Sequence, residues 1–124
     1  MFYDTLINEG VKACSQNEQG DIVATFSFSP DSGIFAGHFP GNPIVPGICQ
    51  LEAVKYMLER TLGCKCRLLQ ADNIKFFQPV FPDQEFTLVV SCTKNGDNML
   101  VRCKGTTGGN DVKSTDIKAR YEIK

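Results

Sequence analysis

The stretch GHFPGNPIVPGICQLEA, residues 37–53, joins a stiff loop to an apolar helix and decides the interpretation of this chain. It contains His38, the only histidine among 124 residues, followed by three prolines before Gly47. Each proline fixes the backbone angle φ and removes a hydrogen-bond donor, so the loop is expected to be rigid. Such a loop suits a side chain that must be held in one position, which makes the single imidazole a candidate for function.

Helix-forming residues continue from Gly47 to Leu62, and Gly63 is a typical helix end. The first three turns are apolar on nearly all sides, which predicts a helix buried in the middle of a domain. One carboxylate, Glu52, falls in this apolar part, where a charge needs a partner or stays protonated. The predicted apolar stripe at helical spacing consists of Ile48, Leu51, Val54, Leu58 and Leu62.

Outside this helix the chain reads mainly as β-structure. Residues 22–28 alternate apolar and polar side chains, a pattern typical of a half-buried strand. Residues 5–16 are a weaker strand candidate, and a short helical turn is expected within 31–36. Short turns connect the later segments, which predicts antiparallel pairing. The expected fold class is α+β, with about six antiparallel strands around one helix; the later strands are predicted at 65–77, 85–94, 98–106 and 112–123.

Length and composition are those of one ordinary globular domain, which we expect to span residues 1–124. The chain is 42% hydrophobic and 22% charged, with a net charge of −1. This balance argues against nucleic acid or a membrane as partner, since both usually demand a basic excess. The N-terminus shows no signal-peptide pattern, so a cytoplasmic location is expected.

The six cysteines do not predict a metal site. The one close pair, Cys64 and Cys66, lacks the CxxC spacing, and a zinc ion would need almost only sulfur ligands because the chain has one histidine. A disulfide framework is conceivable, yet a chain of this length needs no such constraint. Cys49 lies close to the loop, but nothing in the sequence indicates an activated thiol. We expect buried, unligated cysteines and no metal.

The residues of the quoted stretch predict acid–base chemistry. A lone histidine is more often structural, and a lone glutamate on a helix usually faces solvent. Here the stiff loop around His38 and the apolar surroundings of Glu52 favour a functional interpretation. The helix start near Gly47 adds unpaired backbone N–H groups and a positive dipole, which suit an oxyanion. The reaction that fits is proton abstraction beside a carbonyl with loss of a β-leaving group.

The same stretch resembles the active-site segment of the β-hydroxyacyl-acyl-carrier-protein dehydratases, H-F-P-G-x-P-ø-ø-P-G-ø-x-x-x-E-A, where ø is apolar. Glu52 follows His38 by fourteen residues, as that pattern requires. A second segment, KFFQPVFPDQEF at 75–86, is similar to the family's K-F-x-x-P-V-x-P-G-D-x-L stretch. The resemblance implies the hot-dog fold, an antiparallel sheet curled around a long helix, in a homodimer with active sites at the interface and possibly a higher oligomer.

The resemblance also implies a role for each matching position. His38 would take the α-proton of a 3-hydroxyacyl thioester, and Glu52, reaching in from the other subunit, would protonate the departing hydroxyl. The backbone N–H of Gly47 would hold the thioester oxygen, and no metal, nucleotide or other cofactor is implied. The other substrate-binding positions are Ile44, whose carbonyl could orient the imidazole, Phe39, Pro46 and Ile48.

Two larger sets of residues follow from this interpretation. Some phenylalanines could line an acyl tunnel, although about half of them are expected in the core: Phe28, Phe35, Phe39, Phe76, Phe77 and Phe81. The implied partner, an acyl carrier protein, is acidic and would favour a basic docking patch. The candidate cations are Lys55, Arg60, Lys65, Arg67 and Lys75.

Departures from the family pattern leave alternatives open. Tyr56 stands where the family often has Gln, and Pro82-Asp83-Gln84 lacks the family's Gly. The chain looks more like the small dehydratases of specialised clusters, such as those making aryl polyenes, than the housekeeping enzyme. Two other functions remain possible: an acyl thioesterase of the same fold, with Glu52 activating water, and a non-catalytic acyl-binding partner subunit.

Overall fold

A computed structural model describes residues 2–35, 43–108 and 112–124, and the side chains from residue 5 onward. These residues form six strands, two α-helices and one 3₁₀ turn. In order they are α1 (Phe2–Gly10), β1 (Val11–Gln16), β2 (Ile22–Phe26), η1 (Gly33–Phe35), α2 (Gly47–Leu62), β3 (Cys66–Phe76), β4 (Phe86–Asn95), β5 (Asn98–Thr107) and β6 (Val112–Ile123).

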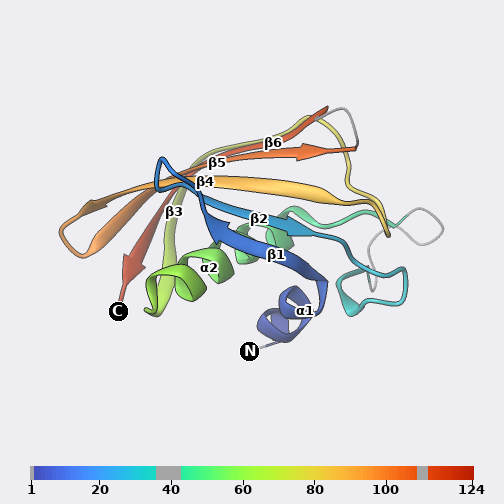
Figure 1. Cartoon of the computed structure of the whole chain (residues 1–124), viewed down its shortest axis with the longest axis horizontal. Helices are drawn as coiled ribbons and strands as arrows, with labels where there is room; N and C mark the ends of the chain where they lie inside the picture. The colour runs from blue at the N-terminus through green and yellow to red at the C-terminus, as the bar shows by residue number, and fades with distance from the viewer. Residues whose placement is uncertain (1, 36–42, 109–111) are drawn as a thin grey trace.

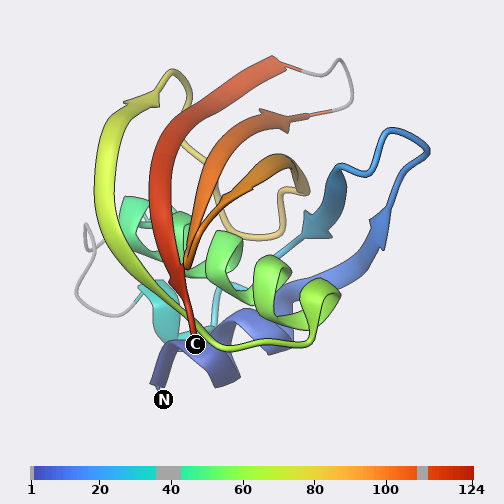
Figure 2. The same ribbon diagram turned by 90° about the vertical axis from the view of Figure 1, so that its left-hand side faces the viewer.

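The strands form one antiparallel sheet in the order β1-β2-β4-β5-β6-β3. Both helices lie on the same side of this sheet (Figure 1), and the sheet curves around α2 (Figure 2). The predicted α+β class and six-stranded antiparallel sheet are therefore confirmed. β3, with eleven residues, is an edge strand that pairs only with β6 in the described part of the chain.

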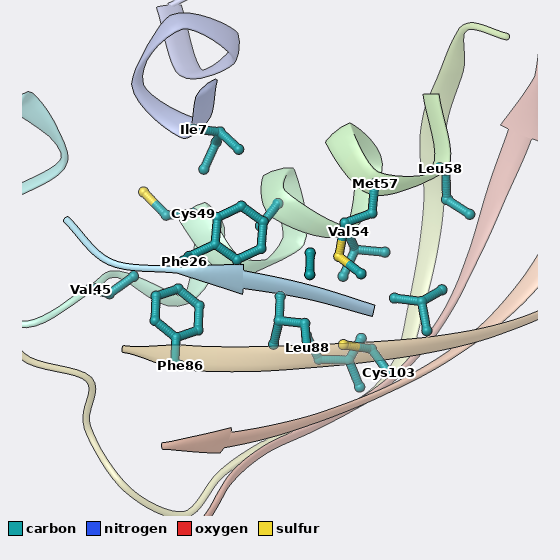
Figure 3. Close-up of a cluster of buried hydrophobic side chains, with 14 of the residues drawn as sticks. Ile7, Phe26, Val45, Cys49, Val54, Met57, Leu58, Phe86, Leu88 and Cys103 are labelled. Atoms are coloured by element: carbon teal, nitrogen blue, oxygen red, sulfur yellow. The ribbon is translucent and has the colours of Figure 1, made fainter. Parts of the chain in front are cut away.

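The core lies between α2 and the concave face of the sheet (Figure 3). Strand β2 buries every second residue, as its alternating sequence predicts. Phe26 stacks on Phe86 of the neighbouring strand β4, with ring centroids 5.5 Å apart. The described residues share a single core cluster, and the extent of the domain over residues 1–124 remains a prediction.

The buried face of α2 differs from the predicted stripe. Val54 and Leu58 are buried as expected, but Ile48 is 47% exposed and Leu62 is 40% exposed. The stripe was wrong at both ends because a helix that is apolar nearly all round does not reveal its orientation; the buried residues of α2 are Cys49, Gln50, Ala53, Val54, Met57 and Leu58.

The N-terminal segment was predicted as a strand over 5–16, and only its second half is one. Residues up to Gly10 form helix α1, and β1 begins at Val11. Adjacent side chains Leu6 and Ile7 are both buried, which a half-buried strand does not allow because neighbouring side chains point to opposite faces. Helix α1 packs against α2 and η1. Among the described residues neither helix is long and apolar enough to cross a bilayer.

Candidate active site

The two sequence segments that resemble the dehydratases meet at the start of α2. The backbone N–H of Val45 donates to the carbonyl of Val80 over 2.7 Å. Two residues further on, Gly47 lies against the ring of Phe76, which ends β3. These contacts join residues about thirty positions apart, so the second segment holds the loop end and the first helical turn in place. The predicted helix from Gly47 to Leu62 is confirmed at both ends.

The first turn of α2 is left open toward ligands. Its N-cap, Pro46, has an extended conformation (φ −63°, ψ 149°), and within the described part of the chain no side chain caps the turn by a hydrogen bond. The leading N–H groups of a helix lack intrahelical partners and carry partial positive charge. This end of α2 can therefore accept an oxygen that develops negative charge, as the sequence predicts for the N–H of Gly47.

Packing against the ring of Phe76 requires a glycine at position 47. A Cβ at this position would lie 2.8 Å from Cε2 and Cζ of Phe76, closer than side-chain carbons tolerate. The sequence suggested that Gly47 admits a ligand oxygen, but it did not reveal that a phenylalanine ring covers the same residue. Phe76 itself is 48% exposed. Its ring thus forms part of the surface that a ligand at the helix start would meet.

Glu52 lines a cavity of about 350 Å³ between α2 and strands β3 and β6. Its Oε2 atom is buried, although the side chain as a whole is only half-buried. Ile48, one helical turn earlier, and Leu51 give the cavity an apolar wall. The carboxyl is therefore held at the edge of an apolar hollow, one and a half turns from Gly47 and on the same helix.

The strand side of this cavity contributes two neutral groups. The hydroxyl of Tyr121 donates to the carbonyl of Leu51 over 3.0 Å and thereby ties the turn that carries Glu52 to β6. Burial, with smaller contributions from Cys66, Cys103 and Glu52, raises the pKa of Tyr121. Burial and the nearby Glu59 raise the pKa of the Cys66 thiol to about 12. Both groups remain protonated at neutral pH, so neither is an activated nucleophile.

Three of the four remaining lining residues are basic. They are Lys55 on α2, Arg67 at the start of β3 and Lys124 at the end of the described chain, and the fourth is Leu68. Arg67 also pairs with Glu122 over 2.7 Å. Two of the five cations predicted for docking, Lys55 and Arg67, thus line the Glu52 cavity.

A buried polar cluster beneath the first turn was not predicted. Gln50 is 3% exposed, and its Oε1 accepts a hydrogen bond of 2.5 Å from the hydroxyl of Thr115. Ser114 and Thr115 are both fully buried because a bulge between β5 and β6 lets consecutive residues point inward. The burial of Ser114 breaks the alternation of inward and outward side chains along β6. The sequence alone does not reveal this break, because the bulge that causes it depends on the pairing with β5.

The remaining predicted site residues divide into two groups. His38 and Phe39 lie outside the described residues. Pro46 is buried and Ile44 is half-buried at the helix entry, while Ile48 reaches the Glu52 cavity. Of the six phenylalanines proposed for a tunnel, Phe28 and Phe35 are core residues, whereas the exposed ones are Phe76, Phe77 and Phe81.

The fold and site together define a hot-dog protein with a glutamate in its central helix. Among solved structures the chain is similar to the dehydratase heterocomplex ApeI:P from Xenorhabdus doucetiae, with a TM-score of 0.77 and 20% identity over 90% of this chain and 96% of that one. A hypothetical thioesterase with coenzyme A from Streptococcus pneumoniae is also similar, with a TM-score of 0.71 and 13% identity over 99% and 94% of the two chains. At these identities both structures show the fold alone.

Sequence comparison is more specific. The model of the ApeI-like dehydratases matches residues 14–115, and the chain belongs to this family. The chain is 32% identical to the 3-hydroxyacyl-[acyl-carrier-protein] dehydratase FabZ of Geobacter metallireducens over 83% of this chain and 75% of that protein. It is 29% identical to the enzyme of the same name from Ehrlichia chaffeensis, over 94% and 85%. The resemblance to the aryl-polyene branch of the dehydratases is thereby confirmed.

Proposed function

We propose that this protein removes water from 3-hydroxyacyl thioesters carried on an acyl carrier protein and yields trans-2-enoyl thioesters. The observation that carries this proposal is the position of Glu52, which lines a cavity with apolar and basic residues and belongs to the same helix that begins at Gly47 without a side-chain cap among the described residues. The names of the related FabZ enzymes supply the acyl carrier and the 3-hydroxyacyl group.

In the proposed reaction His38 takes the α-proton, and the electrons of the broken C–H bond form the new C=C bond. The bond between Cβ and the hydroxyl oxygen breaks, and Glu52 donates the proton that lets this oxygen leave as water. The thioester oxygen, which becomes negative as the proton leaves, accepts a hydrogen bond from the N–H of Gly47. Proton transfer from the imidazole back to the carboxylate resets the site, and no cofactor enters the balance.

We further propose a homodimer in which His38 of one protomer faces Glu52 of the other. Supporting this, β3 is an edge strand, and edges of this length are commonly paired or covered. Exposed apolar side chains continue this edge toward the helix start, at Ile48, Phe76 and Phe77. A second, related chain is the alternative partner, because the similar Xenorhabdus protein is described as a heterocomplex.

The test is a product assay with purified protein and carrier-linked 3-hydroxyacyl substrates. We expect the absorbance of a conjugated enoyl thioester to appear, and the reverse hydration to proceed from the enoyl substrate. Release of free thiol without enoyl product would instead identify a thioesterase. Tight binding of the acyl carrier without turnover would identify a non-catalytic partner subunit.

Substrates of varied tail length, aliphatic and aromatic, would define the acyl group. The exposed rings of Phe76, Phe77 and Phe81 are the side chains expected to contact that tail. The cytoplasmic location expected from the sequence remains a prediction.

A further inference from the structure

Strand β6 is hydrogen-bonded to α2 at two neighbouring residues, Gln50 and Leu51. The hydroxyl of Thr115 donates to the side-chain oxygen of Gln50, and the hydroxyl of Tyr121 donates to the backbone carbonyl of Leu51 over 3.0 Å. Thr115 and Tyr121 lie six residues apart on β6, so both point to the same face of the sheet, and both are fully buried. The two bound residues of α2 lie between the oxyanion donor and the acid of the proposed reaction.

Thr115 supports the first turn of α2 from two sides. Its side chain binds Gln50, which completes the turn that begins at Gly47. Its backbone lies opposite Phe76 in the sheet, and the ring of Phe76 lies against Gly47. A displacement of Thr115 would therefore reach the N–H of Gly47 both through the helix and through β3.

Thr115 is itself held in one position. It lies opposite Gly105 of β5, where a Cβ would come within 2.9 Å of Cβ of Thr115. The adjacent residue Ser114 is also fully buried, and its carbonyl accepts a hydrogen bond of 2.8 Å from the N–H of Phe77. A β-branched side chain has few rotamers, so close packing fixes the direction of the Thr115 hydroxyl toward Gln50.

Tyr121 acts further along the helix, next to Glu52. The carbonyl of Leu51 and the backbone N–H and Cα of Glu52 belong to one planar peptide unit, so a hydrogen bond to this carbonyl restricts the backbone that carries the carboxyl. A carbonyl oxygen has two lone pairs, and the helix uses one of them, which leaves the other for the Tyr121 hydroxyl. Tyr121 also lines the same cavity as Glu52.

We propose that Thr115 and Tyr121 are positioning residues of the dehydration, and that Thr115 places the oxyanion donor at Gly47 whereas Tyr121 places the acid Glu52. The inference rests on the proposed function and adds to it two residues of β6 that act through α2. A displacement of about 1 Å in a reacting group can slow a reaction about 10²-fold. The loss of either hydrogen bond should therefore lower kcat more than it changes KM.

The test uses two carrier-linked substrates with the same acyl chain, one with a 3-hydroxyl group and one with a 3-chloro group. The hydroxyl needs a proton from Glu52 to leave as water, whereas chloride leaves with the electrons of the C–Cl bond and needs no proton. Both reactions form the same enoyl thioester, and both place negative charge on the thioester oxygen. Loss of the acid should slow the first reaction alone, and loss of the oxyanion donor should slow both.

Tyr121→Phe should lower kcat about tenfold for the 3-hydroxyacyl substrate and less than about twofold for the 3-chloroacyl substrate. Thr115→Val should lower kcat about tenfold for both substrates, and Thr115→Ser, which keeps the hydroxyl, should restore most of that loss. KM should change less than about twofold in each variant. The matched control is Tyr56→Phe, which removes a hydroxyl bonded to Asn8 and Arg60 on the same helix and should leave both rates unchanged.

A second measurement does not depend on the chloro substrate. Because Tyr121 is proposed to act through Glu52, the double variant Tyr121→Phe with Glu52→Gln should be no slower than Glu52→Gln alone. Melting curves establish that each variant is folded at the assay temperature. If Thr115→Val is not folded, Gln50→Leu replaces it, since it removes the same hydrogen bond from the helix side.

Equal slowing of both substrates by Tyr121→Phe, or a further tenfold loss in its double variant with Glu52→Gln, would overturn the proposal. Wild-type kcat in Tyr121→Phe or Thr115→Val would overturn it too, as would an equal loss in Thr115→Ser and Thr115→Val. In each of these cases wild-type turnover of the 3-hydroxyacyl substrate leaves the dehydratase function standing. If the wild type forms no enoyl product from that substrate, the proposed function itself fails.

Discussion

The two ends of α2 are capped differently. At the C-terminal end Gly63 adopts a left-handed conformation (φ 67°), and its N–H donates to the carbonyl of Glu59 over 3.0 Å. The last turn also carries Arg60, a cation that favours the negative end of the helix dipole. At the N-terminal end the cap is Pro46, and no side chain makes a capping hydrogen bond within the described residues. The closed end is a structural stop, whereas the open end keeps donors for a ligand.

The N-terminal end of α2 also has its own supporting contacts. The open turn rests on the buried bond between Gln50 and Thr115 and is covered by Phe76. An end left without a cap would be expected to fray. Contacts from below and from outside stabilise this end in place of a side-chain cap. We therefore expect substitutions of the first turn to affect activity, and the substitution of Gly63 at the other end to affect stability only.

The largest effect is expected for Glu52→Gln. The amide keeps the size of the side chain but cannot donate the proton that the leaving hydroxyl needs, so kcat should fall about 10²–10⁴-fold. Thermal melting should show an unchanged fold. Lys104→Gln on the outer sheet face serves as the matched control and should keep full activity. Near-normal turnover by the Glu52 variant would remove the carboxyl from the mechanism.

Gly47→Ala should have the next largest effect. The new methyl group would lie 2.8 Å from the Phe76 ring, so the first turn must shift. We expect a loss of about 1–3 kcal/mol in the free energy of unfolding and a fall of about 10²-fold in kcat/KM, because the oxyanion donor is displaced.

The double variant Gly47→Ala with Phe76→Ala checks the cause. Removing the ring should restore part of the lost stability, and a double-mutant cycle measures this coupling. Simple addition of the two single effects would show that the ring does not restrict Gly47.

Thr115→Val tests the support beneath the open turn. It leaves the buried Oε1 of Gln50 without its donor, and we expect a cost of about 1–3 kcal/mol in chemical denaturation. Pairing it with Gln50→Leu should recover most of that cost, because both polar partners are then gone. The control is Thr25→Val, which removes a half-buried hydroxyl contact with Thr87. A cost no larger than that of the control would argue that the buried cluster contributes little.

The smallest effect is expected at the closed end. Gly63→Ala places a side chain in the left-handed region and should cost about 1 kcal/mol in the free energy of unfolding. The activity of the folded protein should stay unchanged, because Gly63 lies about three helical turns from Glu52 and does not line the Glu52 cavity. Reduced kcat in this variant would mean that the two ends are not independent.

The sequence predicts those parts of the molecule that depend on local patterns. A run of helix formers that ends at Gly63 predicted α2 from Gly47 to Leu62, and alternating side chains with short turns predicted the antiparallel sheet. The pair Gln50 and Thr115 was not predictable, because it joins residues 65 positions apart through a bulge. The exposure of Ile48 depends on how α2 is rotated against the sheet. Helix α1 was missed because its short sequence fits a weak strand pattern as well.

The candidate site, too, was predictable only where it depends on one segment of the sequence. Its chemistry was predicted from Glu52, Gly47 and the spacing of His38, since these are local features of one segment. The cavity around Glu52 combines α2 with β3 and β6, so its tyrosine and basic rim required the fold. The contact of Gly47 with Phe76 required both motif segments to meet in space.

The most direct test of the central claim is to mix two inactive variants, His38→Ala and Glu52→Gln, and let the dimers exchange subunits. If each active site takes His38 from one protomer and Glu52 from the other, a mixed dimer contains one intact site. An equal mixture should then recover about a quarter of wild-type activity. A mixture that stays as inactive as its components, although mass spectrometry shows that mixed dimers have formed, would contradict the shared site.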